Sequence, residues 1–242
     1  VPKCHIAVTG IEKVVPSMED VSALLALLTR SATGQHITTY FNMISGPRKA
    51  EELDGPEEVH LVLVDNGRSS IYQDDELLDT LRCIRCGACM NHCPVYGAVG
   101  GHAYGWVYPG PMGAVLTPSF IGVDQGGHLP NASTFCGRCA EVCPMRIPLP
   151  KMMRHYRAKE YEEGLAPPAV RFGLDLWGFV AKRPRLYRLA TRIAMGALGR
   201  IGRKRGRLSS LPLAEGWTKH RDFPAPEGRT FQDQWDAMGG AR

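Results

Sequence analysis

The sequence predicts an α+β fold in three consecutive parts, and three observations carry that prediction. Over residues 1–70, short apolar runs alternate with a helical stretch, as in an α/β unit. Seven of the eight cysteines gather between residues 83 and 143. The remaining segment combines helical apolar periodicity with many arginines. We therefore expect an α/β part at 1–70, a mainly helical cysteine-rich domain at 71–165, and a helical basic region at 166–242.

In the first part, strands are expected at His5–Thr9, Ile37–Ile44 and Val59–Val64. Ser17 is expected to cap a helix whose apolar residues fall on one face. Three strands and one helix cannot easily close a domain, so this part is interpreted as the end of a larger α/β domain. Cys4 stands apart from the other cysteines and is expected to be a buried core residue.

Around the cysteines, a short helix is predicted over Asp74–Arg82. The Gly- and Pro-punctuated stretch Tyr96–Pro130 is predicted to be a long loop. Helices are predicted again at Pro150–Glu163 and, as one or two helices, over Val170–Arg200.

The composition is that of an ordinary globular protein, with 44% hydrophobic residues in 242. No window approaches the ~20 apolar residues of a membrane span, and no signal-peptide pattern opens the chain. The cysteines have the close spacing of a metal site in a reducing compartment rather than that of a disulfide framework. We therefore expect a cytoplasmic location, with peripheral membrane association as an open alternative.

The first cysteine motif is the CxxCxxCxxxCP run of bacterial ferredoxins, formed by Cys83, Cys86, Cys89 and Cys93. The second motif has three cysteines, Cys136, Cys139 and Cys143, and Ser133 stands where its first cysteine would be expected. Zinc sites pair CxxC units and seldom use four cysteines in one run, which favours iron–sulfur clusters over zinc.

In two-cluster ferredoxins the fourth cysteine of each run binds the other cluster. The first cluster, a [4Fe–4S], is therefore assigned to Cys83, Cys86, Cys89 and Cys143. The second is assigned to Cys93, Cys136 and Cys139, and it is one thiolate short. It is either a [3Fe–4S] cluster or a [4Fe–4S] cluster completed by a weaker ligand such as Ser133, a water or a substrate atom. The alternative role of Ser133 is to cap the next turn.

The net charge of +5 is unevenly distributed, because Lys182 to Arg207 holds ten Lys or Arg residues and no acid. Such a segment suits an anionic membrane face, an acidic partner subunit or nucleic acid. A solvated basic helical face is the plainer alternative.

A family resemblance joins these features. The segments HIAVTGIEKVVPSMED, LRCIRCGACMNHCPVYGAVGGHAYGWVYPGPMGAVLTP, CGRCAEVCPMRIPLP and WTKHRDFPAPEGRTFQDQW resemble the B subunit of the LutABC L-lactate utilization system. The resemblance implies that the first ~70 residues end an LUD domain, most of which is absent from this chain. It also implies two sister subunits, oxidation of L-lactate to pyruvate, and cluster ligation by the seven cysteines.

The leading functional hypothesis is an iron–sulfur electron-transfer subunit that passes electrons from L-lactate oxidation toward an acceptor. No nucleophile–base pair, phosphate loop or dinucleotide motif is visible, and no catalytic residue is assigned. One alternative is the iron–sulfur subunit of another 2-hydroxy-acid or glycerol-phosphate oxidase. Another is a redox-sensing nucleic-acid-binding protein, although no specific nucleic-acid contact is expected.

Overall fold

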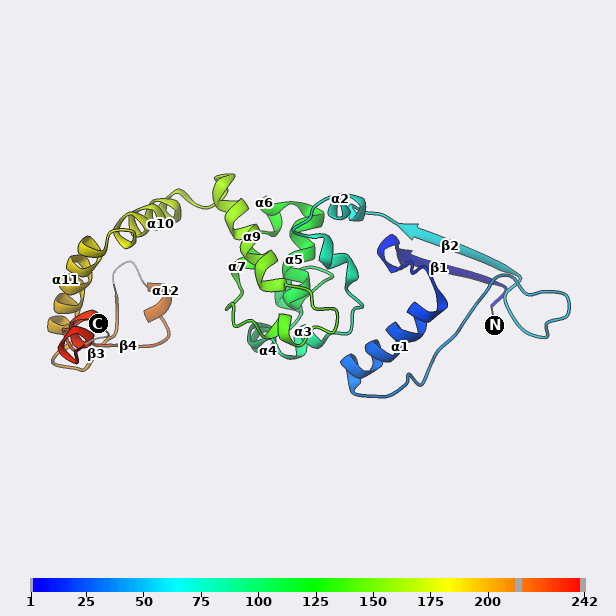
Figure 1. Cartoon of the computed structure of the whole chain (residues 1–242), viewed down its shortest axis with the longest axis horizontal. Helices are drawn as coiled ribbons and strands as arrows, with labels where there is room; N and C mark the ends of the chain where they lie inside the picture. Colours follow the sequence, from blue (N-terminus) through cyan, green and yellow to red (C-terminus); the bar gives the residue numbers. More distant parts are fainter. Residues whose placement is uncertain (1, 212–214, 240–242) are drawn as a thin grey trace. The chain divides into compact units, whose positions relative to one another are not determined.

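The computed structural model describes residues 2–211 and 215–239, and it has the predicted α+β fold (Figure 1). The chain divides into two compact units, Val1–Leu165 and Ala166–Arg242. The first unit contains a small α/β segment followed by a helical body that carries the cysteines, and the second contains the C-terminal helices. None of the helices within the described ranges combines the length and apolar character that crossing a bilayer requires.

The α/β segment consists of β1 (Cys4–Gly10), the 3-10 helix η1 (Ile11–Lys13), α1 (Met18–Thr33) and β2 (Glu58–Val64). The two strands pair in parallel, from Cys4 opposite Glu58 to Gly10 opposite Val64. The Ser17 side chain accepts a hydrogen bond from the backbone N–H of Asp20, so the predicted helix cap is confirmed. The strands predicted at His5–Thr9 and Val59–Val64 are confirmed as well.

Two expectations for this segment are wrong. Ile37–Ile44 forms no strand, and its residues Ile37 and Tyr40 are 79% and 90% exposed. A strand needs a neighbour to complete its hydrogen bonds, and β1 and β2 pair only with each other in the described residues. Cys4 is exposed rather than buried, because its face of the sheet, with Ile6 and Val8, is uncovered.

The helical body contains α2 (Arg68–Tyr72), η2 (Leu78–Arg82), α3 (Ala88–Asn91), α4 (Pro94–Val99), η3 (His102–Tyr104), α5 (Gly110–Ile121), α6 (Val123–Gly126), α7 (His128–Asn131), α8 (Arg138–Glu141) and α9 (Leu149–Glu162). The helix predicted at Pro150–Glu163 is confirmed by α9. The predicted helix over Asp74–Arg82 is a turn followed by the shorter η2.

The long loop predicted over Tyr96–Pro130 is wrong, because α5 lies inside it and forms the centre of the body (Figure 1). The first nine residues of α5 are buried, and Val115 is fully enclosed. Gly113 lets the helix approach the Tyr108 carbonyl oxygen, with which any Cβ would collide. The glycines that suggest a loop therefore serve close packing.

The core of the body forms where α5 packs against α9. Leu149, Met152 and Met153 of α9 are almost completely buried, as is Ile147 just before it. The Tyr156 hydroxyl lies 2.6 Å from the Ser119 hydroxyl, which joins the two helices by a hydrogen bond. This core supports both cysteine motifs, because Cys89, Cys139 and Cys143 pack against it.

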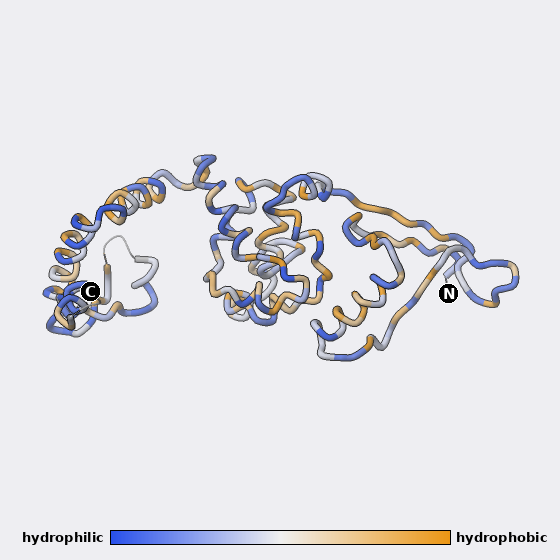
Figure 2. Tube along the Cα trace, viewed as in Figure 1, coloured by the Kyte–Doolittle hydropathy of each residue, from blue (hydrophilic) through white to orange (hydrophobic). Residues whose placement is uncertain are grey.

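The second unit contains α10 (Pro168–Ala181), α11 (Pro184–Gly202), β3 (Arg207–Leu208), α12 (Glu215–Thr218), β4 (Phe223–Pro224) and α13 (Phe231–Ala237). The helical structure predicted over Val170–Arg200, as one or two helices, is confirmed and consists of two, α10 and α11. β3 and β4 pair antiparallel. The α10 helix buries no residue, and the hydropathy colouring of Figure 2 shows apolar residues along it.

Candidate iron–sulfur centres

The seven clustered cysteines surround two small cavities in the helical body. Cys83, Cys86, Cys89 and Cys143 line one, which we call the first site. Cys93, Cys136 and Cys139 line the other, the second site, together with Ser133. Each predicted ligand set therefore lies around one cavity, and the last cysteine of each motif lines the cavity of the other motif.

The two motifs turn their chains in the same way. The residue before the second motif position and the glycine after it both have left-handed backbone angles, namely Arg85 and Gly87 (φ 62° and 78°) in one motif and Phe135 and Gly137 (φ 53° and 83°) in the other. Non-glycine residues rarely adopt this conformation, and such strain gathers at functional sites. The repeated geometry wraps each loop around its cavity.

The last cysteine of each motif is oriented by a backbone donor. Cys93 caps α4, and its Sγ accepts a hydrogen bond from the N–H of Tyr96 at 3.5 Å. The Cys143 Sγ accepts one from the N–H of Ile147, also at 3.5 Å. Hydrogen bonds to sulfur stabilise the thiolate and are among the features that set a cluster's potential.

Three of the thiols have a raised pKa and are therefore poorer acids than an ordinary cysteine. Burial raises the pKa of Cys89 to about 12 and that of Cys139 to about 11, and it also raises the pKa of Cys86. Iron binds the thiolate, so metal must displace these protons when a cluster forms. Four soft sulfur donors around the first site and three around the second fit iron–sulfur clusters, with one position of the second site left without a thiol.

Ser133 occupies the position without a thiol. Its Oγ accepts a hydrogen bond from the backbone N–H of Phe135 at 3.1 Å, so its side chain shapes the turn before Cys136. This contact favours the role of a turn cap over that of a ligand.

Arg157 of α9 holds the same turn, a role that no motif in the sequence predicted. Its guanidinium donates hydrogen bonds of 2.9–3.2 Å to the carbonyl oxygens of Pro130, Asn131 and Ser133. The group also lies 4.2 Å from the ring centre of Phe135. Burial lowers the pKa of Arg157. The one sequence signal was an arginine on the apolar side of α9, one position after Tyr156.

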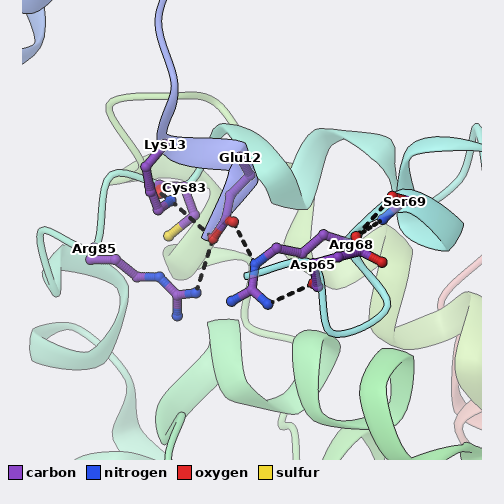
Figure 3. Close-up of polar contacts among 7 residues, drawn as sticks. All are labelled: Glu12, Lys13, Asp65, Arg68, Ser69, Cys83 and Arg85. Atoms are coloured by element: carbon purple, nitrogen blue, oxygen red, sulfur yellow. Dashed lines mark hydrogen bonds and ion pairs between the residues drawn. The ribbon is translucent and has the colours of Figure 1, made fainter. Parts of the chain in front are cut away.

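A second polar group, the Glu12 network, consists of Glu12, Lys13, Arg68 and Arg85 (Figure 3). The Glu12 side chain is 5% exposed and forms an ion pair with Arg68, which is 8% exposed. Arg85 and Lys13 lie 3.8 Å and 3.6 Å from the other Glu12 oxygen. The network thus connects η1 of the α/β segment with α2 and with the loop of the first site.

Lys13 also donates a hydrogen bond to the carbonyl oxygen of Cys83. Burial lowers the pKa of Lys13, and the charge of Glu12 opposes that shift. Arg85 stacks over the Tyr108 ring at 4.0 Å. Two cationic side chains, Lys13 from η1 and Arg85 from the loop itself, therefore lie at the loop that carries three of the first-site cysteines.

Three family models match successive parts of the chain. The LUD domain model matches residues 1–64, the 4Fe-4S dicluster domain model matches 79–147, and the model of the C-terminal region of lactate utilisation protein B matches 153–239. No solved structure matches the chain.

Curated relatives give the same result. Proteins named lactate utilization protein B are 46% identical in Anoxybacillus flavithermus, 45% in Bacillus pumilus and 44% in Geobacillus kaustophilus. Each match covers 96% of this chain and 49% of the relative. The chain therefore spans about half the length of the curated relatives it matches.

The resemblance predicted from the sequence is confirmed by these matches. Over nearly its whole length, the chain resembles the lactate utilization protein B family, with matches to an LUD domain, a 4Fe-4S dicluster domain and that family's C-terminal region in this order.

Proposed function

We propose that this chain belongs to an iron–sulfur subunit that carries electrons in a complex oxidising L-lactate to pyruvate. The observation that carries the proposal is the pair of neighbouring cysteine-lined cavities. Oxidation of lactate releases two electrons and two protons, and two clusters can each take one electron at a time. The names of the relatives and the dicluster domain support the proposal.

We assign Cys83, Cys86, Cys89 and Cys143 to a [4Fe–4S] cluster and Cys93, Cys136 and Cys139 to the second cluster. The second cluster is a [3Fe–4S], or a [4Fe–4S] completed by a non-thiolate ligand. The hydrogen bond that Ser133 accepts supports a site held by three cysteines. When bound, the clusters supply one-electron transfer, while the chain holds them and keeps water away with residues such as Tyr104, Met112 and Leu149.

The ligand assignment is tested by comparing two variants at Ser133. Ser133→Ala should retain the second cluster and its electron paramagnetic resonance spectrum, because the hydroxyl only shapes a turn. Ser133→Cys supplies the thiol that the motif lacks and should convert a [3Fe–4S] signal into that of a [4Fe–4S] cluster. Loss of the second cluster in Ser133→Ala, with the first retained and the fold intact, would show that the serine is a ligand.

The electron-transfer proposal is tested anaerobically on the full-length protein with its sister subunits. L-Lactate should bleach the visible cluster absorption rapidly, and D-lactate should not. Reduction of the clusters by glycolate or glycerol 3-phosphate instead of L-lactate would indicate that the protein is a subunit of another oxidase. Clusters that respond only to dithionite would exclude lactate as the electron source.

We also propose that the second unit binds a sister subunit of the complex, which we place in the cytoplasm. Phe172 and Trp177 of α10 are 70% and 65% exposed, and such apolar surface marks interaction sites. The basic segment Lys182–Arg207 is partly neutralised, because Arg188, Arg192 and Arg207 pair with Asp236, Asp233 and Asp222. This pairing favours a protein partner over an anionic membrane.

The choice of partner is tested with the double variant Phe172→Ser/Trp177→Ser. It should weaken co-purification of the sister subunits, while a matched change on α11, Arg185→Ser, should not. Sedimentation of the wild type with anionic vesicles at low salt, lost in the double variant, would instead establish the membrane as the partner.

A further inference from the structure

The two sites differ in where the cations of their loops lie. Each loop carries one arginine, but Arg138 of the second loop follows Cys136 and pairs with Glu141. Arg85 and Phe135 occupy equivalent positions, each directly before the second position of its motif and each with a left-handed backbone. One is a guanidinium and the other a neutral ring. The first loop therefore carries a cation that the second lacks at the same point.

The Glu12 network adds to this difference. It contains one carboxylate and three cationic side chains, so it is net positive. Lys13 reaches the backbone of a first-site cysteine by donating to the Cys83 carbonyl oxygen. Figure 3 shows Lys13 and Arg85 approaching the same side of Glu12, with the Cys83 sulfur nearby.

We propose that Lys13 and Arg85 raise the reduction potential of the first cluster, and that Glu12 positions both of them. Reduction adds negative charge to a cluster, and a nearby cation in a poorly solvated site stabilises that charge. Donation to the Cys83 carbonyl acts in the same direction, because it withdraws electron density from the peptide next to a ligand. Glu12, Lys13 and Arg85 are positioning residues, since they change the electrostatic environment of the cluster without binding its iron.

The proposal also gives the α/β segment a part in electron transfer. Lys13 and Glu12 belong to η1, directly after β1, whereas Arg85 belongs to the first-site loop. Any movement of η1 away from that loop would remove a cation from the first site and lower its potential. The α/β segment would in this way adjust how readily the first cluster accepts an electron.

A redox titration of the full-length protein, monitored by electron paramagnetic resonance, tests this inference. Lys13→Met and Arg85→Met should each make the first cluster harder to reduce, by on the order of tenfold in the reduction equilibrium, or about 59 mV for one electron. The second cluster should keep its potential. Lys13→Arg keeps the positive charge and should retain most of the wild-type potential. Lys151→Met, which removes an exposed cation paired with Glu76, should change neither potential.

A structural role alone would give a different result. Variants that lose thermal stability but keep both potentials would overturn the inference, as would equal shifts of both clusters. Arg85 is partly exposed, so Arg85→Met keeps the test available if Lys13→Met fails to fold. The inference rests on the proposed ligand assignment, and different experimental results would contradict the inference and the assignment. Absence of two clusters from the wild type defeats the assignment, whereas unchanged potentials with both clusters present defeat only the tuning.

Discussion

Arg157 offers the sharpest test of how the protein holds its second site. Replacement by methionine keeps the aliphatic stem and removes the guanidinium that bonds three carbonyl oxygens before Cys136. Hydrogen bonds to a charged donor contribute about 1.5–3 kcal/mol each when well buried. Because this group is partly exposed, about 1 kcal/mol for each carbonyl is reasonable, or about 3 kcal/mol in all.

A loss of this size should lower the melting temperature by about 6–12 °C in a unit of this length. It should also release iron from the second site before the first, because the turn carries Cys136 and its neighbours. Differential scanning calorimetry and iron analysis of the holoprotein measure the two effects. Selective loss of the second-cluster resonance signal would identify the site affected.

Arg154→Met is the matched control. Arg154 lies one turn earlier on α9, with its guanidinium 5.8 Å from the same Phe135 ring, and its side chain is exposed. Arg154→Met should lower the free energy of unfolding by less than about 0.5 kcal/mol. Equal melting temperatures and equal iron contents in the two variants would refute the argument that the carbonyl contacts hold the turn.

Three further predictions concern packing, pH and metal. Gly113→Ala should destabilise the protein by about 3 kcal/mol in denaturant unfolding because its Cβ collides with the Tyr108 carbonyl oxygen, while Gly97→Ala, in open space, should not. The Arg192 hydrogen bond lowers the pKa of Asp233 to about 2, below its ordinary 3.8. The ionised Asp233 therefore contributes to the stability of the fold above pH 4, and this stabilisation is lost as the pH falls toward 2. The stability gap between wild type and Asp233→Asn should close over that interval, and a constant gap would contradict it. Removing iron with a chelator should lower the melting temperature and release the cysteine-bearing loops to proteolysis, whereas an unchanged digestion pattern would contradict a structural role for the clusters.

Local signals in the sequence predicted much of this architecture. The spacing of the cysteines was sufficient to group Cys143 with the first motif, and the structure places these residues around one cavity. Ser17 likewise predicts where α1 begins, and the apolar residues on one face of α1 predict which side of the helix is less exposed. Such features depend on residues a few positions apart, which is why one sequence reveals them.

Other features depend on contacts between distant residues. The α5 helix is apolar around its whole circumference and rich in glycine, so it lacks the periodicity that marks a surface helix. Glu12 meets Arg68 and Arg85 only after folding, and Arg157 meets Pro130 across the body. Ile37–Ile44 has strand-like composition, yet pairing decides whether a strand forms.

With the ligands assigned as proposed, the exchange of cysteines between the two motifs would also make each cluster a crosslink. A cluster bound as proposed would tie Cys89 to Cys143, roughly 50 residues apart, and the other would tie Cys93 to Cys136, roughly 40 residues apart. By analogy with disulfides, closing either loop lowers the entropy of the unfolded chain and so stabilises the folded protein by about 4 kcal/mol. Because one loop lies inside the other, the two stabilising effects overlap. A single cut in the chain between the motifs, for example next to the exposed Trp106, would leave the two pieces joined through iron and sulfur.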